Sequence, residues 1–297
     1  MKCNLCPRRC DAERTLTHGD GACGMGTLPV VARAARHRWE EPCISGIRGS
    51  GTVFFCGCAL GCVFCQNAPI SQGTLAGQVF TPQALSELFR RVEGLGVHNL
   101  NLVSPTHFAP AIFEALRIRK PQIPVVWNSS GYESVAMVQA AAGLVDVFLP
   151  DIKYATAATG QALAGAPDYF PVAMDAVAAM CAVTGAPQWD AEGMLTRGTL
   201  VRHLVLPLRV TESIAILQAI AERLPAGTPV SLMRQYTPMT DTAIQGLDRR
   251  LTAREYARAR EAMEMLGLEG YLQAKEAATS AFTPAFMDAE SIALFEG

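Results

Sequence analysis

From residue 51 onward the hydrophobic pattern of this chain alternates between short apolar runs and segments with helical spacing. Apolar runs of strand length fall at 51–56, 99–104, 124–128, 145–149, 199–206 and 230–233. Between them apolar residues recur every three to four positions, as in 85–92, which follows the helix-start signal Thr81-Pro82. Strands that alternate with helices are typical of a parallel sheet with helices packed outside it.

The number of strand–helix units narrows the fold class further. Eight units would close a full barrel, so six predict an α/β fold with an open, partial (β/α)6 TIM-like barrel over residues 51–297, including a C-terminal helix and tail. A doubly wound sheet is the alternative, and periodicity does not separate the two. In either fold the chemistry belongs at the carboxyl ends of the strands. Residues 1–50 lack the alternation and are predicted to form a Cys-rich N-terminal metal-binding extension.

Polar residues do follow the predicted strands where each one ends. They are Ser104-Pro105-Thr106-His107, Asn128-Ser129-Ser130, Asp151-Ile152-Lys153, Arg202-His203 and Arg234-Gln235-Tyr236. Any one of them is as easily an ordinary loop residue or a helix cap. Because parallel strands end at one edge of a sheet, the set together predicts a shared site.

Three cysteines follow the first strand in the spacing Cys58-x3-Cys62-x2-Cys65. Residues this close in sequence do not easily reach disulfide geometry, whereas tightly spaced thiolates suit a soft metal centre. Three thiolates would hold three irons of a four-iron cluster and leave the fourth open to chelate an amino acid. Zinc or buried spare thiols are the alternative, but no fourth ligand lies nearby in the sequence.

This motif, with Phe64 just before its last cysteine, resembles the radical S-adenosylmethionine superfamily. The wider stretch 57–67 is similar to the pyruvate formate-lyase activating enzymes and their relatives. The resemblance implies a [4Fe-4S] cluster and S-adenosylmethionine, which is cleaved reductively to a 5′-deoxyadenosyl radical that abstracts hydrogen. It also implies a protein substrate, such as a glycine of a glycyl radical enzyme, and an electron donor such as flavodoxin or ferredoxin.

The resemblance also implies roles for residues at the strand ends. Asp151-x-Lys153 is similar to a pair near the cofactor in glycyl-radical activases, and the charge of Lys153 suits the methionyl carboxylate. Arg202 resembles their fifth-strand arginine, and Asn128 stands where the family contacts the nucleoside. Gln235, at the end of the sixth strand, is also expected to bind the cofactor.

The second strand departs from the activase pattern. The usual Gly-Gly-Glu is missing, and Ser104-Pro105-Thr106-His107 takes its place. Thr106 and His107 are therefore assigned to the cofactor amine, with the alternative that His107 faces the substrate. No side chain needs to act as a general base when the radical forms, so no catalytic side chain is predicted.

The N-terminal extension carries a second group of thiols, Cys3, Cys6, Cys10 and Cys23. Four thiols with glycine turns between them predict a tetrathiolate site, and the spacing does not decide between zinc and a second iron–sulfur cluster. The opening resembles that of an uncharacterised branch of activating-enzyme-like proteins. A disordered arm with incidental cysteines is the alternative.

Composition removes several function classes. The chain has 297 residues, half of them hydrophobic, a formal net charge of −2 and a pI near 6.2, which give no global attraction to nucleic acid or anionic membrane. No apolar run approaches a membrane span, and the start lacks a signal-peptide pattern. Ten cysteines, most of them clustered, indicate metal in a reducing cytoplasm.

Two alternatives to the activase reading stay open. One is a radical S-adenosylmethionine enzyme acting on a small molecule, RNA or another peptide, although no basic stripe interleaved with aromatics favours RNA. The other is a non-enzyme, an iron–sulfur electron-transfer or metal-handling protein with two clusters. A carrier would ligate its cluster fully, whereas the triad leaves one iron open.

Overall fold

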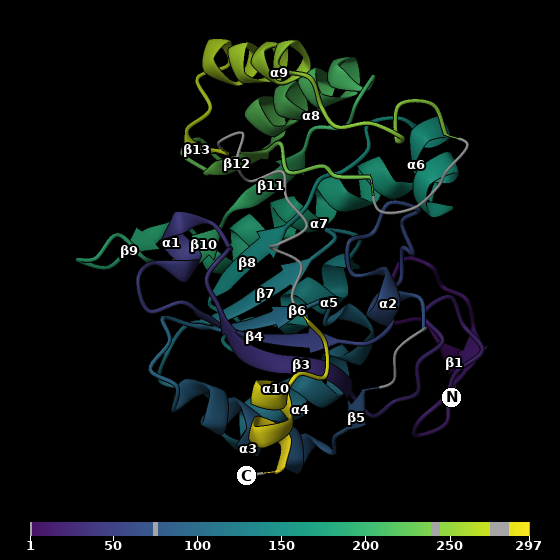
Figure 1. Ribbon diagram of the computed structural model, residues 1–297, viewed down its shortest axis with the longest axis vertical. Coiled ribbons are helices and arrows are strands. Elements are labelled where there is room, and N and C mark those ends of the chain that lie inside the picture. Colours follow the sequence, from purple (N-terminus) through teal and green to yellow (C-terminus); the bar gives the residue numbers. More distant parts are fainter. Residues whose placement is uncertain (1, 74–76, 239–243, 274–284, 297) are drawn as a thin grey trace.

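The computed structural model describes residues 2–73, 77–238, 244–273 and 285–296, and its centre is an eight-stranded sheet (Figure 1). The sheet order is β5-β3-β4-β6-β7-β8-β10-β9. The strands are β3 (Val30–His37), β4 (Ser50–Phe55), β5 (Gln78–Val79), β6 (Leu100–Val103), β7 (Val125–Ser129), β8 (Val147–Pro150), β9 (Gln188–Trp189) and β10 (Leu195–Thr199). The run from β4 to β10 is parallel and follows chain order, which confirms the predicted parallel α/β sheet.

A second sheet continues this order. It contains the parallel strands β11 (Val201–Leu204), β12 (Val230–Met233) and β13 (Gly270–Leu272). One residue, Leu200, separates β10 from β11, and Asp151 after β8 forms a parallel bridge to Arg202 in β11. A doubly wound sheet reverses its strand order at a switch point. In the described part of the chain the parallel strands show no such reversal.

Helices connect the strands, and α3 (Pro82–Glu93) covers the repeat at 85–92 that the sequence predicts as helical. The helices are α1 (Pro42–Ser45), α2 (Ala68–Ser71), α3 (Pro82–Glu93), α4 (Ala109–Ile118), α5 (Val135–Ala140), α6 (Ala157–Ala164), α7 (Tyr169–Thr184), α8 (Val210–Arg223), α9 (Ala253–Met265) and α10 (Ala289–Glu296). A short 3₁₀ turn, η1 (Thr106–Phe108), precedes α4. The Thr81 side chain caps α3, and Thr252 with Glu255 forms a capping box on α9. Within the described residues, no helix is long and apolar enough to cross a bilayer.

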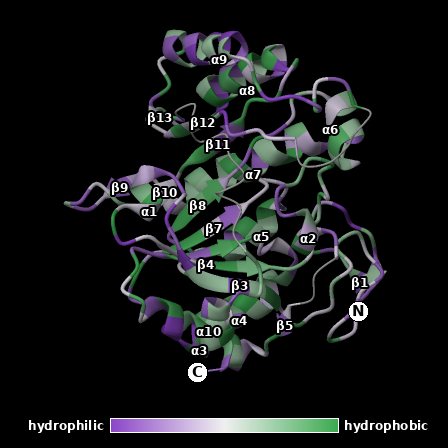
Figure 2. Cartoon of the chain, viewed as in Figure 1, coloured by the Kyte–Doolittle hydropathy of each residue, from purple (hydrophilic) through white to green (hydrophobic). Residues whose placement is uncertain are grey.

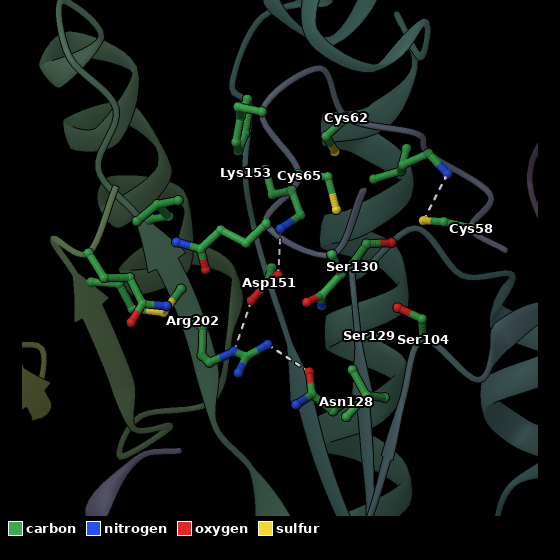
Figure 3. A pocket seen from close by; sticks show the side chains of 18 of the residues that line it. Cys58, Cys62, Cys65, Ser104, Asn128, Ser129, Ser130, Asp151, Lys153 and Arg202 are labelled. Carbon is green, nitrogen blue, oxygen red and sulfur yellow. Dashed lines mark hydrogen bonds and ion pairs between the residues drawn. The ribbon is translucent and has the colours of Figure 1, made fainter. Parts of the chain in front are cut away.

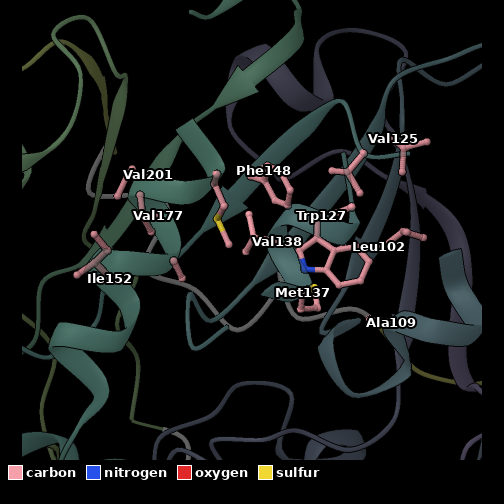
Figure 4. Close-up of a cluster of buried hydrophobic side chains, with 14 of the residues drawn as sticks. Leu102, Ala109, Val125, Trp127, Met137, Val138, Phe148, Ile152, Val177 and Val201 are labelled. Atoms are coloured by element: carbon pink, nitrogen blue, oxygen red, sulfur yellow. The ribbon is translucent and has the colours of Figure 1, made fainter. Parts of the chain in front are cut away.

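The two faces of the parallel strands differ in polarity because side chains alternate along a strand. One face supplies Leu102, Trp127 and Phe148 to the main hydrophobic core, where the helices cover them (Figures 2 and 4). The opposite face carries Asn101, Asn128, Arg202 and Ser231, all shielded from solvent or nearly so. Polar side chains on this opposite face are typical of a binding site, whereas a face covered by a second layer of helices would be apolar.

The first 50 residues divide between the extension and the main sheet. β3 pairs antiparallel with β4, with Ala34 opposite Val53, although β3 precedes residue 50. Only β1 (Lys2–Cys3) and β2 (Ala12–Glu13) form a separate two-stranded sheet. The C-terminal segment lies along β3, where the Met287 N–H donates to the Ala32 carbonyl. The domain division at residue 50 stays a prediction, and the sheet does not follow it.

Candidate functional site

A cavity of about 230 Å³ lies where the parallel strands end (Figure 3). Of the residues predicted from the sequence, the cavity is lined by Cys58, Cys62, Cys65, Asn128, Asp151, Lys153, Arg202 and Gln235. These residues come from the ends of five different strands, β4, β7, β8, β11 and β12, as the carboxyl-end rule requires. The structure therefore brings the cysteine triad and five of the seven predicted cofactor-binding residues into one space.

The cysteine loop follows β4 directly and turns through two glycines. Gly57 and Gly61 have φ values of +80° and +62°, in the left-handed region that favours glycine. A Cβ at Gly57 would lie 2.8 Å from the Cys23 carbonyl oxygen, so the loop packs closely against the N-terminal extension. These turns direct the triad toward the cavity.

Each thiol of the triad has one hydrogen-bond donor. The Leu60 N–H lies 3.4 Å from the Cys58 sulfur and the Ser71 hydroxyl 3.4 Å from the Cys65 sulfur. Tyr154 donates its hydroxyl to the Cys62 sulfur at 3.1 Å. Burial raises the pKa of Cys62 to about 12 and raises that of Cys65 as well. A bound metal overcomes such a cost, because a coordinating thiol is deprotonated outright.

The donor set of the triad bears on the kind of metal centre that it could hold. Among the described residues, no group of three His, Cys, Asp or Glu side chains is arranged to hold a single metal ion. The donor set of the triad, three soft thiolates each with a hydrogen-bond donor, suits an iron–sulfur cluster.

A buried ionic network forms the cavity floor. Arg202 donates from Nε to Asp151 Oδ1 at 2.8 Å, from one terminal nitrogen to Asn128 Oδ1 at 2.7 Å and from the other to Glu40 at 3.1 Å. Lys153 Nζ donates to the second Asp151 oxygen at 2.5 Å. Burial alone would raise the pKa of Asp151, but Arg202 and Lys153 outweigh it and hold that pKa below its usual value. All three guanidinium nitrogens are thus committed within the protein.

Glu40 is a member of this network that the sequence analysis missed. Its carboxylate accepts from Asn101, Asn128 and Arg202 and lines the cavity. Burial raises the pKa of Glu40, and also that of its neighbour Glu41, whose carboxylate lies 3.9 Å from Arg202. The signal available in the sequence was weak, since an acidic pair before a proline reads as a solvated turn.

Thr106 and His107 do not line the cavity. Thr106 donates to the buried Glu133 at 2.7 Å, and the His107 ring nitrogen bonds the Cys56 carbonyl at 2.6 Å. Burial lowers the pKa of His107 to about 4, so the ring is neutral, and burial raises the pKa of Glu133 to about 7. Ser104, two residues earlier, lines the cavity instead, and its φ of +57° turns the chain away after it.

The four N-terminal thiols lie close to one another outside the cavity. Burial raises the pKa of Cys6 to about 11, and the charges of Cys23, Cys10 and Cys3 add to the rise. Arg14 lies 3.7 Å from the Cys3 sulfur and also donates to the His107 carbonyl at 2.8 Å. The structure therefore gathers the four predicted cysteines.

Comparison with known proteins agrees with this geometry. No family model matches the chain. An uncharacterised protein of Methanocaldococcus jannaschii is 29% identical over 281 residues, which are 90% of this chain and 75% of that protein. Streptococcus suis SuiB bound to S-adenosylmethionine has a similar structure, with a TM-score of 0.51 and 11% identity over 75% of this chain and 50% of SuiB.

A radical S-adenosylmethionine methyltransferase from Sphaerobacter thermophilus is also similar, with a TM-score of 0.50 and 14% identity over 84% of this chain and 77% of that chain. Such identities establish the fold alone, and this chain spans about half the length of SuiB. The protein has the fold of radical S-adenosylmethionine enzymes, a mixed α/β fold with a parallel sheet.

Proposed function

We propose that this protein is a radical S-adenosylmethionine enzyme. The observation that carries the proposal is a single cavity at the strand ends that holds the Cys58, Cys62 and Cys65 thiols beside an Asp151–Lys153–Arg202 network. When bound, a reduced [4Fe-4S] cluster supplies the electron that cleaves S-adenosylmethionine to methionine and a 5′-deoxyadenosyl radical, which abstracts hydrogen from the substrate.

Lys153 is the residue that we assign to the methionyl carboxylate. Its ammonium group has three N–H donors, and the described contacts use one of them, on Asp151. Burial alone would lower the pKa of Lys153, but Asp151 and the nearby Cys62 raise it above its usual value, so the charge is retained. A retained, partly uncommitted cation in a cavity suits an anionic ligand.

Arg202 has a different role in the proposal. Because its nitrogens already contact Asp151, Asn128 and Glu40, it holds these side chains in place rather than binding the cofactor directly. Asn128 then presents its remaining amide hydrogen toward the nucleoside. Ser104, Ser129 and Ser130 also line the cavity, and we assign the cofactor amine to this serine edge in place of Thr106 and His107.

The finer fold assignment is part of the same proposal. The strand order β4-β6-β7-β8, followed by β11 and β12, supports an open, partial (β/α)6 barrel around the polar inner face. Such a barrel would exclude water from the radical while leaving one side accessible. The resemblance of the cysteine loop to activating enzymes supports a glycine of a partner protein as the hydrogen source, with a flavodoxin- or ferredoxin-like electron donor.

We also propose that the four N-terminal cysteines bind a second iron–sulfur cluster. The mutual effect of these thiols on the pKa of Cys6 supports a shared centre. Metal analysis of the anaerobically prepared protein tests this assignment. Iron near eight per chain without zinc would support it, whereas one zinc per chain would contradict it.

The proposed activity is tested with anaerobically reconstituted protein, dithionite and S-adenosylmethionine, with 5′-deoxyadenosine as the measured product. The variant is Cys58→Ala/Cys62→Ala/Cys65→Ala, and the matched control is Cys181→Ala, a buried thiol outside the cavity. Product from the native protein and the control but not from the triple variant would establish the enzyme. A fully loaded protein that neither forms product nor perturbs its cluster spectrum on adding S-adenosylmethionine would favour an electron carrier.

A further inference from the structure

We propose that Tyr154 sets the reduction potential of the cluster by donating a hydrogen bond to the Cys62 thiolate. This inference rests on the proposed function, since it assumes that Cys62 is a cluster ligand. Tyr154 would be a positioning residue, because it acts on the cluster through the sulfur of another side chain. The sequence analysis assigned it no role, although it immediately follows Lys153.

The contact is closer than the other two sulfur contacts of the triad. The Tyr154 oxygen lies 3.1 Å from the Cys62 sulfur, whereas the Leu60 and Ser71 donors lie 3.4 Å from theirs. Hydrogen bonds to an ionised acceptor are shorter and stronger than neutral ones, and a ligated cysteine is a thiolate. The phenol is therefore the strongest of the three donors once the cluster is bound.

Packing fixes the direction of the phenol. Tyr154 is completely buried, and its ring meets Tyr169 edge-on at 5.0 Å and Phe64 edge-on at 6.3 Å between centroids. Phe64 itself lies between Cys62 and Cys65 in the motif. Burial disfavours the charged phenolate, so the hydroxyl keeps its proton and remains a donor. The aromatic packing thus holds one O–H against one sulfur.

The consequence for the redox step follows from charge. Reduction adds one electron to the cluster and transfers no atom, and part of the added negative charge resides on the cysteine sulfurs. A donor at the sulfur stabilises the reduced state more than the oxidised state, and hydrogen bonds to sulfur are among the groups that set cluster potentials. Tyr154 should therefore raise the reduction potential of the cluster, which makes the cluster easier to reduce and a weaker reductant toward S-adenosylmethionine.

The short segment 151–154 contacts both the space proposed for S-adenosylmethionine and a proposed cluster ligand. Asp151 and Lys153 face the cavity, while Tyr154 contacts the sulfur of Cys62. Lys153 also acts on Cys62 through its charge. A change in the position of segment 151–154 would alter the cofactor contacts and the cluster potential together.

The test is a redox titration of the cluster followed by electron paramagnetic resonance. Tyr154→Phe removes the donor and keeps the ring, so the midpoint potential should become more negative at unchanged iron content. Ser71→Ala should give a smaller shift in the same direction, because its contact is longer and only partly buried. Tyr132→Phe is the matched control, since its hydroxyl donates to Asp168 rather than to sulfur, and it should leave the potential unchanged.

A second variant keeps the test decisive if Tyr154→Phe does not load iron. Site-specific 3-fluorotyrosine at position 154 makes the hydroxyl a stronger donor, and the potential should then rise. The inference would be overturned by an unchanged potential in whichever of the two position-154 variants loads iron. An equal shift in Tyr132→Phe would overturn it as well. If the native protein does not cleave S-adenosylmethionine, the proposed function is overturned instead. Failure of the inference and failure of the proposed function are therefore distinguishable.

Discussion

The two groups of cysteines show how differently one side chain is used in two regions of this molecule. Cys62 is buried in the cavity, and its hydrogen-bond donor, Tyr154, lies 92 residues away in the sequence. Cys10 is exposed, and the thiols that surround Cys6 all belong to the first 23 residues. The arrangement of the Cys58, Cys62 and Cys65 thiols therefore depends on contacts across the sheet. The arrangement of the N-terminal thiols depends mainly on residues close to them in sequence.

The arginines of the two regions differ in the same way. Arg202 pairs with the carboxylates of Asp151 and Glu40 in a buried network. Arg8 instead donates to four backbone carbonyls, those of Ala59, Leu60, Ala164 and Gly165, and so fastens the extension to the cysteine loop and to the end of α6. One arginine balances buried charge, and the other joins two segments.

The largest effects are expected from replacing each of the two cysteine groups in turn, because the two replacements should abolish different signals. Changing Cys58, Cys62 and Cys65 to Ala should abolish 5′-deoxyadenosine formation, because no other described thiols line the cavity. Changing Cys3, Cys6, Cys10 and Cys23 to Ala should remove the second metal centre but leave the S-adenosylmethionine-responsive signal. Iron content and electron paramagnetic resonance measure both results. Loss of both signals in the second variant would show that the regions are not independent.

Removal of Arg202 is expected to give the next largest effect. In Arg202→Met the buried carboxylates of Glu40 and Asp151 lose their partner, which should lower the free energy of unfolding by about 3 to 5 kcal/mol. The matched control is Arg223→Met, because Arg223 pairs with Asp175 at an exposed site where about 1 kcal/mol or less is expected. Anaerobic urea unfolding measures both variants. Equal losses of unfolding free energy in the two variants would mean that the Arg202 network is not buried in solution.

Arg8→Ala should have a smaller and more local effect. Its loss leaves four carbonyls without their charged donor, at a cost of about 1 to 3 kcal/mol in the attachment of the extension. Hydrogen exchange should rise over residues 2–29 and at the cysteine loop, with the central strands unchanged. Arg9→Ala at the exposed neighbouring position is the control. Faster exchange throughout the sheet would contradict a local role.

The smallest effect concerns Glu133, a buried residue outside the cavity lining that accepts from Thr106 and Trp127. Because its pKa is raised to about 7 in the folded state, the folded protein holds a proton that the unfolded chain releases above its usual pKa. Its contribution to stability should therefore fall by about 1 kcal/mol between pH 6 and pH 8. In Glu133→Gln this fall should disappear. Unfolding free energies of both proteins at the two pH values measure the difference, and parallel pH profiles would refute it.

Much of the site was predictable because its residues occupy strand ends, where sequence and position are tightly linked. The cysteine triad, Asp151, Lys153 and Arg202 lie together as the strand pattern indicates. Thr106 and His107 lie outside the cavity lining, and the positive φ of Ser104 at the turn before them is not evident from the sequence.

Two other features depend on contacts distant in sequence. Glu40 enters the network through Arg202, Asn128 and Asn101, and no local pattern links residues so far apart. β3 escaped prediction because Arg33, Arg36 and His37 interrupt its apolar positions, while β13 is only three residues long. Periodicity detects neither a strand with charged positions nor a strand of only three residues, which is too short to show alternation.

The pairing of Glu40 with Arg202 also has a consequence for biosynthesis. The two residues are 162 positions apart, and Arg8 meets the Gly165 carbonyl 157 positions away. During translation the N-terminal segment therefore emerges long before its partners exist, and contacts of such long range form late in folding. All of its thiols are exposed to the cell in that interval. If the proposed clusters are bound, their stable insertion is therefore expected only after synthesis has passed β11, which carries Arg202.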